Sequence, residues 1–383
     1  MMRIGAEKAL IGGNLKSALI EINSGKISKI SLSPSSIELK NADYHLASGI
    51  LSAGLIDLQI NGCFGSDFAA ATSTEWLLML TSLASHGVTS IAPTIITAPI
   101  AEMVASIERA KSFGVLTEKK GVTRVLGFHV EGPYLSAKYR GAHEERFLKD
   151  PDHAEIQQFI DTRAVCVFTL APERAGTDLA IKQLVGAGVV VSIGHSDASA
   201  DDVRRAVANG ARFATHVYNA QRKPNAVDGG LAEILFAHKE LHYGLIDDEV
   251  HVPRARVNEA FRSAGGRIVL VTDAVSAMGM APGEYLLGGY PIVLRAGDVA
   301  RRLDGVMAGA VLALDEAVGN CINGGNDPVV ALEAATRTPA DLIGRNDLGR
   351  IEVGARADLV WLSGPTSKLR ATKTWIAGEE IAN

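Results

Sequence analysis

Hydrophobic positions along the chain change their spacing twice, which divides the sequence into three parts. Residues 1–50 contain short apolar runs separated by small turn residues, such as "SALIEI" and "GKISKISL", and these predict strands. From residue 54, apolar runs of strand length alternate with segments whose apolar residues recur every three or four positions. Past residue 345 the strand pattern returns in "GRIEVGARADLVWLSG" and "KTWIAGEEIAN". The pattern therefore predicts an alternation of strands and helices between two strand-rich ends.

The middle part contains eight candidate strands, at residues 54–60, 87–95, 125–131, 165–173, 189–197, 211–219, 241–248 and 268–275. Amphipathic segments such as "TEWLLMLTSLASHG" and "SADDVRRAVANG" lie between them, and most end in glycine, which favours helix termination. Buried strands that alternate with helices predict a parallel sheet, and eight such units indicate an α/β fold of the (β/α)8 TIM-like barrel type. A doubly wound sheet is the competing architecture, but the chain has no GxGxxG or GxxxxGK[ST] motif to support it.

The two strand-rich ends predict a second, smaller unit. Chain termini often lie close together, so we expect residues 1–52 and 346–383 to pair as a small β-sandwich domain beside a barrel of residues 53–345. The chain has 383 residues, 47% hydrophobic and 21% charged, which is ordinary globular composition with ample length for a large core.

Charge and cysteine content narrow the function classes. A net charge of −5 without any basic block gives no electrostatic reason to bind nucleic acid or an anionic membrane. The three cysteines are odd in number and widely spaced, which favours a reducing compartment. No signal-peptide core begins the chain, and no apolar run reaches the ~18 residues of a membrane span. We therefore expect a cytoplasmic protein.

Polar residues stand at the carboxyl ends of the predicted strands, where barrel enzymes place their chemistry. Glu131, His195 and His216 come from three strands and form the ligand set of a catalytic Zn²⁺ site with one open position. A metal would offset the cost of burying the Glu131 charge after an apolar strand. Asp273, on the eighth strand, is suitably placed as a base toward an attacking water.

Each of these residues also has a simpler interpretation when taken alone. A strand-end histidine is usually a hydrogen-bonded core or mouth residue, and Glu131 or Asp273 could cap the backbone that follows it. The convergence of four polar strand ends on one barrel mouth favours the metal site.

The motifs that surround these residues are specific enough to compare with a known family. They read "GLIDLQINGCFGSDF", "GFHVEGPYLS", "RGAH" at residues 140–143, "SIGHSDA", "THVYNA" and "LVTDAVSAMG". From about residue 50 to its end, the chain resembles the N-acetylglucosamine-6-phosphate deacetylase family of the amidohydrolase superfamily. The resemblance implies hydrolysis of N-acetylglucosamine-6-phosphate to glucosamine-6-phosphate and acetate.

The resemblance also implies a role for each site residue. Glu131, His195 and His216 would hold the metal, and Asp273 would take a proton from the attacking water and later give it to the leaving amine. His143 would polarise the acetyl carbonyl. The positions that the resemblance places around the substrate are Gln59, Asn61, Ala142, Asn219, Ala220, His251 and Met307, the last with its neighbours Ala308 and Gly309.

One family feature concerns the number of metal ions. Many amidohydrolases carry an HxH pair after the first strand, whereas this chain reads Gln59-Ile60-Asn61 there. Neutral amides are poor ligands beside imidazole. We therefore expect one divalent ion per subunit, with Zn²⁺ as the expected metal.

The phosphate contacts depart from the family pattern. The family supplies a histidine that matches His251 and an arginine that reaches in from a neighbouring subunit, but the arginine position holds Val227 here. Arg222 and Lys223 could supply the charge instead, or the substrate could lack a 6-phosphate. A homodimer follows from the resemblance alone.

Other functions compete with this interpretation. They include deacetylation of a related N-acetyl hexosamine (the galactosamine epimer or an unphosphorylated sugar) and another amidohydrolase reaction on an N-acyl compound or cyclic amide. A metal-dependent lyase or aldolase is a further alternative, although Asp273 and the strand-rich ends argue against it. A catalytically dead binding protein is disfavoured by the intact set of metal ligands and base.

Overall fold

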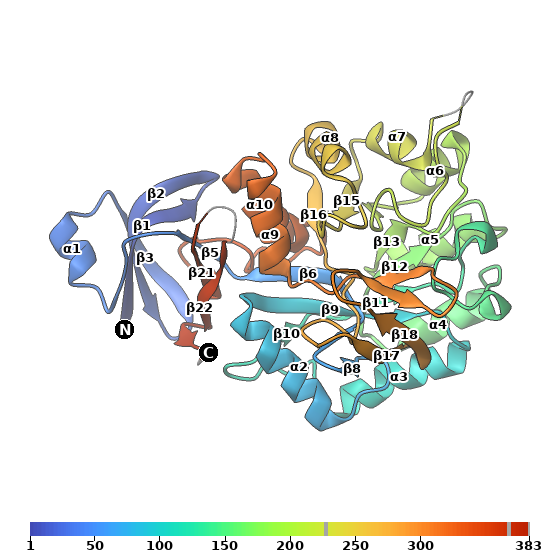
Figure 1. Cartoon of the computed structure of the whole chain (residues 1–383), viewed down its shortest axis with the longest axis horizontal. Helices are drawn as coiled ribbons and strands as arrows, with labels where there is room; N and C mark the ends of the chain where they lie inside the picture. The colour runs from blue at the N-terminus through green and yellow to red at the C-terminus, as the bar shows by residue number, and fades with distance from the viewer. Residues whose placement is uncertain (226–228, 366–368, 382–383) are drawn as a thin grey trace.

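The computed structural model describes residues 1–225, 229–365 and 369–381, and its central feature is a closed parallel barrel (Figure 1). The barrel strands are β6 (Leu55–Ile60), β9 (Val88–Ile96), β11 (Phe128–Glu131), β12 (Val165–Leu170), β13 (Val190–Ile193), β14 (Phe213–Ala214), β15 (His242–Leu245) and β16 (Ile268–Leu270). They pair in that order, and the short β10 (Arg124–Val125) extends the pairing beside β9. A parallel bridge between Ile60 and Ala274 closes the ring. The predicted barrel is confirmed, and the doubly wound sheet is excluded.

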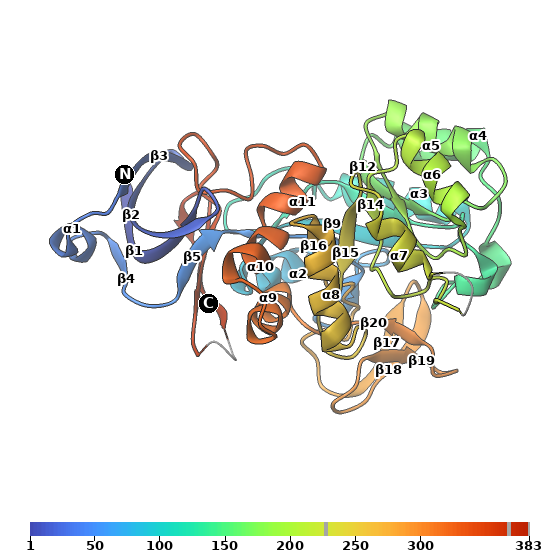
Figure 2. The ribbon, with the colours of Figure 1, turned by 90° about the horizontal axis from the view of Figure 1, so that it is seen from above.

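Helices pack around the barrel and cover its strands (Figures 1 and 2). They are α2 (Ser73–Ser85), α3 (Ile100–Ser112), α4 (His153–Asp161), α5 (Thr177–Gly186), α6 (Ala200–Ala208), α7 (Leu231–Phe236), α8 (Arg254–Ala264), α9 (Leu314–Asn323), α10 (Pro328–Ala334) and α11 (Arg337–Leu342). The starts of α2 and α6 are fixed by capping boxes, in which Thr72 pairs with Glu75 and Ser199 pairs with Asp202. Because strands and helices share one large apolar core, the strand ends are held at fixed positions around the mouth.

The two ends of the chain join in one separate eight-stranded sheet, where the sequence predicted a small β-sandwich. It contains β1 (Met2–Ile11), β2 (Asn14–Asn23), β3 (Lys26–Leu32), β4 (Tyr44–Leu46), β5 (Ile50–Ala53), β21 (Leu359–Ser363), β22 (Arg370–Ile376) and β23 (Glu379–Glu380), with α1 (Ser36–Lys40) at one side. Antiparallel pairing of β21 with β5 joins the two ends, and Figure 1 places both termini on this unit. Its own core includes Ile4, Ile20 and Trp375. We propose to divide the domains at residues 53 and 345, because β5 ends at Ala53 and the barrel begins with β6.

A four-stranded antiparallel sheet that the sequence analysis did not predict follows the eighth barrel strand (Figure 2). It consists of β17 (Gly283–Leu287), β18 (Tyr290–Leu294), β19 (Ala300–Arg302) and β20 (Met307–Gly309). A bridge between Ala274 and Ala310 ties its last strand to the barrel mouth. The available signal was Gly288-Gly289 between two apolar runs, a two-residue hairpin turn.

Smaller elements complete the mouth, namely the ribbon β7 (Gly62–Cys63) with β8 (Ser66–Asp67) and two 3-10 turns, η1 (Ala137–Tyr139) and η2 (Glu145–Phe147). Across the described ranges, no helix combines the length and the apolar composition that crossing a bilayer requires.

Candidate active site at the barrel mouth

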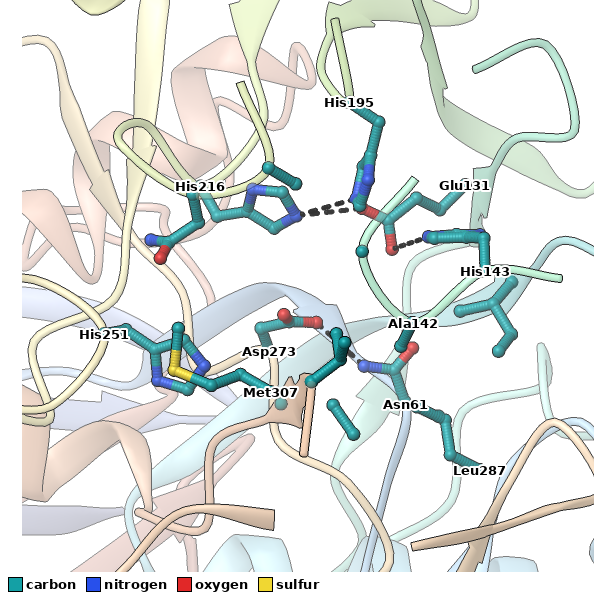
Figure 3. A pocket seen from close by; sticks show the side chains of 17 residues that line it. Asn61, Glu131, Ala142, His143, His195, His216, His251, Asp273, Leu287 and Met307 are labelled. Carbon is teal, nitrogen blue, oxygen red and sulfur yellow. Dashed lines mark hydrogen bonds and ion pairs between the residues drawn. The ribbon is translucent and has the colours of Figure 1, made fainter. Parts of the chain in front are cut away.

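One pocket opens at the carboxyl ends of the barrel strands, and it collects most of the predicted site residues (Figure 3). Of the positions named for catalysis, metal binding or substrate contact, all but Gln59, Arg222 and Lys223 line it. The pocket is therefore built mainly from the ends of different barrel strands, as in other barrel enzymes.

Glu131, His195 and His216 form the innermost group. The Nε2 atoms of the two histidines lie 3.1 Å apart, and each lies 3.2 Å from Oε1 of Glu131. All three residues are at most 4% exposed. Each comes from the end of its own strand, β11, β13 or β14, so the fold itself brings the three ligand atoms together.

The group fits a divalent metal ion by its donor chemistry. His195 donates from Nδ1 to the carbonyl oxygen of Tyr139 over 2.9 Å, which leaves the lone pair of Nε2 facing the centre of the group. A histidine that binds a metal ion usually donates its other ring N–H to a carbonyl or carboxylate oxygen in this way. Two buried imidazole nitrogens that face one carboxylate oxygen are the donor set of a zinc-type site. These three residues therefore form a potential metal site.

Glu131 remains charged in spite of its burial. Burial alone raises the pKa of Glu131, but the hydrogen bonds and positive charges that His195 and His216 offer when their rings are protonated outweigh burial and hold the pKa well below its usual range. The amide Nε2 of Gln59 also donates to Oε1 over 3.1 Å. Gln59 thus acts on the site from behind Glu131 and does not line the pocket.

Asp273 lies across the pocket from the two histidines (Figure 3). Asn61 donates from Nδ2 to Oδ1 of Asp273 over 2.8 Å, and Gln59 donates to the same oxygen over 3.4 Å. Burial, with the nearby negative charge of Glu131, raises the pKa of Asp273 to about 6. A carboxyl group with a pKa near neutrality can both accept and return a proton.

His143 lies beside Glu131, with its Nε2 atom 3.9 Å from Oε2 of that residue. Burial, with the nearby His195, lowers the pKa of His143 to about 3, so the ring is neutral. Thr97 contacts its other nitrogen, with Oγ1 at 2.7 Å from Nδ1. A neutral imidazole in this place can donate one hydrogen bond into the pocket.

Strained backbone is concentrated at the strand ends that carry the site. His195, His216, Ala220 and Asp273 are not glycines, yet their φ angles are 50°, 24°, 46° and 49°. Such conformations cost about 1–3 kcal/mol each and persist only where the surroundings enforce them. The cost indicates that the fold gives these side chains their direction at the expense of stability.

His251 is held by a short turn after β15. Its Nδ1 atom lies 2.6 Å from Oδ2 of Asp248, and its backbone N–H donates to the other oxygen of the same carboxylate. His251 lines the pocket on the side of Met307 (Figure 3). Its ring is therefore held in place at the pocket wall.

The expected phosphate contacts lie at the edge of the site. Arg222 is outside the lining; its backbone N–H donates to Ser196 over 3.0 Å, and its carbonyl accepts from Leu231. Val227, which takes the place of the family arginine, lies outside the described residues. Among the described residues that line the pocket there is no lysine or arginine.

Sequence reasoning missed part of the apolar wall. Leu287 ends β17 of the unpredicted four-stranded sheet, Val306 lies in the turn before β20, and Ile96 ends β9. Together with Met307, they supply apolar side chains to the pocket wall. The hairpin signal at Gly288-Gly289 could have located Leu287.

Comparison with known proteins places this site in a family. Residues 50–381 match the sequence model of the amidohydrolase family. The chain belongs to the amidohydrolase family. Members of this superfamily hydrolyse amides with a metal ion, in agreement with the cluster of Glu131 and two histidines.

Named amidohydrolase relatives cover almost all of the chain. The N-acetylglucosamine-6-phosphate deacetylase of Danio rerio is 34% identical over 348 residues, which are 87% of this chain and 84% of that protein. The N-acetylgalactosamine-6-phosphate deacetylase of Shewanella sp. (strain ANA-3) is 34% identical over 385 residues, 99% of this chain and 95% of that protein. A Mycobacterium smegmatis N-acetyl-D-glucosamine-6-phosphate deacetylase, solved in complex with N-acetyl-D-glucosamine-6-phosphate, superposes with a TM-score of 0.90 at 30% identity. The superposition covers 100% of this chain and 99% of the Mycobacterium smegmatis chain.

Proposed function

We propose that this amidohydrolase removes the N-acetyl group of N-acetylglucosamine-6-phosphate and yields glucosamine-6-phosphate and acetate. The observation that carries the proposal is the arrangement of two acidic groups in one pocket. Glu131 and two imidazoles form a potential metal site. Asp273 lines the same pocket and is held by a hydrogen bond from Asn61. The names of the relatives support the choice of an acetylated amino-sugar phosphate.

Glu131, His195 and His216 would hold one divalent ion, which we propose to be Zn²⁺ because of its preference for imidazole and carboxylate ligands. When bound, this ion supplies Lewis acidity, which lowers the pKa of water and polarises a carbonyl. The amides of Gln59 and Asn61 are hydrogen-bonded to Glu131 and Asp273, which leaves no second imidazole pair for another ion at this place.

Asp273 carries both proton transfers, and His143 stabilises the acyl oxygen. Asp273 accepts a proton from the attacking water and returns it to the amine nitrogen as the C–N bond breaks. The raised pKa of its carboxyl group, about 6, suits both transfers. His143 donates a hydrogen bond to the acyl oxygen and stabilises the charge that develops there.

The remaining lining residues would orient the sugar. We assign the polar contacts to His251, Asn219 and the backbone of Ala220, and packing against the sugar ring to Ala142 and Met307. Arg222 and Lys223 are the first candidates for the charge that Val227 does not supply.

The galactosamine epimer is a second candidate substrate, because the relative of that name aligns with 99% of the chain.

We propose a cytoplasmic location, which the three unpaired cysteines support. A homodimer remains part of the proposal, and sedimentation of the pure protein tests it.

The test of the proposed function is acetate release from four sugars assayed side by side. These are the 6-phosphates of N-acetylglucosamine and N-acetylgalactosamine, and the two unphosphorylated parents. We expect the highest kcat/KM for N-acetylglucosamine-6-phosphate. A preference for the other epimer or for a plain sugar would correct the substrate, and release from none of the four would reject deacetylation of amino sugars.

A further inference from the structure

Thr97 is a buried polar residue that the proposed mechanism does not use. It follows directly after β9 and is 2% exposed. It does not line the pocket, but its hydroxyl and its backbone amide both face the ring of His143. Its position behind a proposed catalytic side chain raises the question of what it contributes.

The contacts of Thr97 determine which nitrogen of His143 carries the proton. Its backbone N–H, which can only donate, is directed at Nδ1 of His143 over 3.4 Å. Its Oγ1 lies 2.7 Å from the same nitrogen and 3.3 Å from the carbonyl oxygen of Glu131. In the opposite arrangement, Nδ1 would donate its proton to Oγ1 and the hydroxyl would donate to the carbonyl of Glu131, but the amide N–H of Thr97 would then be directed at a protonated nitrogen. With Nδ1 as acceptor, the hydroxyl donates to it over the shorter distance and the amide N–H is directed at the same lone pair, so the proton of the neutral ring resides on Nε2.

The Nε2 atom is the one that faces the reaction. It lies on the side of Glu131, at 3.9 Å from Oε2, whereas Nδ1 is turned toward β9. A proton on Nε2 therefore makes His143 a donor into the pocket, and a proton on Nδ1 would present a lone pair to the acyl oxygen.

The Glu-Gly-Pro motif makes room for this arrangement. A Cβ atom on Gly132 would lie 2.2 Å from Oγ1 of Thr97, and Gly132 has a φ of +87°. Any other residue at position 132 would displace the hydroxyl from His143. The glycine that follows the metal ligand Glu131 thus has a second reason to be there.

We propose that Thr97 is a positioning residue that fixes His143 as the tautomer protonated on Nε2, so that His143 donates to the acyl oxygen of the substrate. The inference rests on the proposed function for its effect on rate. The tautomer itself is independent of the substrate.

The kinetic test uses Thr97→Val and Thr97→Ser in the metal-loaded enzyme. Valine keeps the branched shape and the backbone N–H but removes the hydroxyl, whereas serine keeps the hydroxyl. We expect Thr97→Val to lower kcat about 10- to 100-fold with little change in KM, because only stabilisation of the transition state is lost. Thr97→Ser should stay within about threefold of the wild type.

Two controls separate positioning from packing. Thr89→Val makes the same change within β9, the strand that Thr97 follows, at a buried threonine whose hydroxyl donates to Leu55 and which does not line the pocket. It should leave kcat unchanged. In a His143→Ala background, Thr97→Val should cost no further activity, because the residue it positions is gone. A full additional loss in that background would overturn the proposal.

The direct readout is the ¹⁵N spectrum of the histidine side chains in metal-loaded protein, with His143 assigned by its loss in His143→Gln. We expect a ring protonated at Nε2 in the wild type and a rise in the Nδ1-protonated form in Thr97→Val. A wild-type ring protonated at Nδ1 would overturn the inference, whether or not the enzyme turns over the acetylated sugar. Failure of the sugar assay with the expected spectrum would reject the function and leave the tautomer standing.

Discussion

Asn61 donates a hydrogen bond of 2.8 Å to Asp273 across the seam at which the first and eighth barrel strands meet. The backbone N–H of Asp273 also donates to the carbonyl oxygen of Gln59 over 2.8 Å. The Gln-Ile-Asn segment therefore serves as a pair of amide donors that orients two carboxylates. If the enzyme holds one metal ion, as we propose, this arrangement gives the amides at the place of an HxH pair a role of their own.

Asp273→Asn should abolish turnover without removing the metal. The amide keeps the size of the carboxyl group but cannot accept a proton from water, so we expect kcat to fall by about 10³-fold or more. Metal analysis of the same preparation should give the wild-type content. Activity within tenfold of the wild type would refute the role of Asp273 as base.

Metal analysis of the pure protein should give one divalent ion per chain, and His195→Ala or His216→Ala should reduce it well below one. His129→Gln is the matched control, since His129 is a buried histidine on the same strand as Glu131. Its two ring nitrogens already contact Leu58 and Thr169, at 2.9 Å and 2.7 Å. It should bind a full equivalent, although its Tm falls. Two equivalents per wild-type chain would contradict the single site.

Arg222→Ala should raise KM for N-acetylglucosamine-6-phosphate by about tenfold and leave KM for the plain sugar unchanged, because a charge-assisted contact to phosphate is lost. Arg204→Ala, on the exposed side of α6, removes the same charge far from any predicted contact. It should change neither value. An equal rise for both sugars would show that Arg222 does not bind phosphate.

Asp57 links the stability of the barrel to pH. It is 1% exposed and accepts hydrogen bonds from Thr272 and from the backbone of Gln59. Burial outweighs these bonds and raises the pKa of Asp57 to about 7. Because an unfolded aspartate titrates near ~3.9, the folded state binds more protons between these values. Folding stability from this group therefore declines as the pH rises from about 4 to about 7.

Asp57→Asn removes this titration while its amide can still bond to Thr272. The Tm of the variant minus that of the wild type should increase from about pH 5 to about pH 8. Asp298→Asn is the control, because hydrogen bonds from Arg301 lower the pKa of Asp298 to about 2, below the range of the experiment. Its difference from the wild type should stay constant. A pH-independent difference for Asp57→Asn would show that burial does not raise the pKa of Asp57.

The sequence predicted that Glu131, His195, His216 and Asp273 come together, because the parallel strands of a barrel bring their carboxyl ends to one mouth, whatever the conformation of the loops. His195 and His216 are 21 residues apart in the chain, yet strand order alone made them neighbours. The place of Leu287 in the pocket wall could not be predicted in this way, because it depends on how an antiparallel insertion folds back over the mouth. Thr97 was missed because its contact to His143 joins residues that are 46 positions apart in the chain, and no local pattern encodes it.

The most direct test of the central claim is acetate release from N-acetylglucosamine-6-phosphate by protein stripped of metal and then titrated with Zn²⁺. We predict that the stripped protein is inactive, and that activity rises in proportion to added metal and levels off at one equivalent per chain. Full activity of the stripped protein, or none after reloading, would contradict a single-metal amidohydrolase that acts on this sugar.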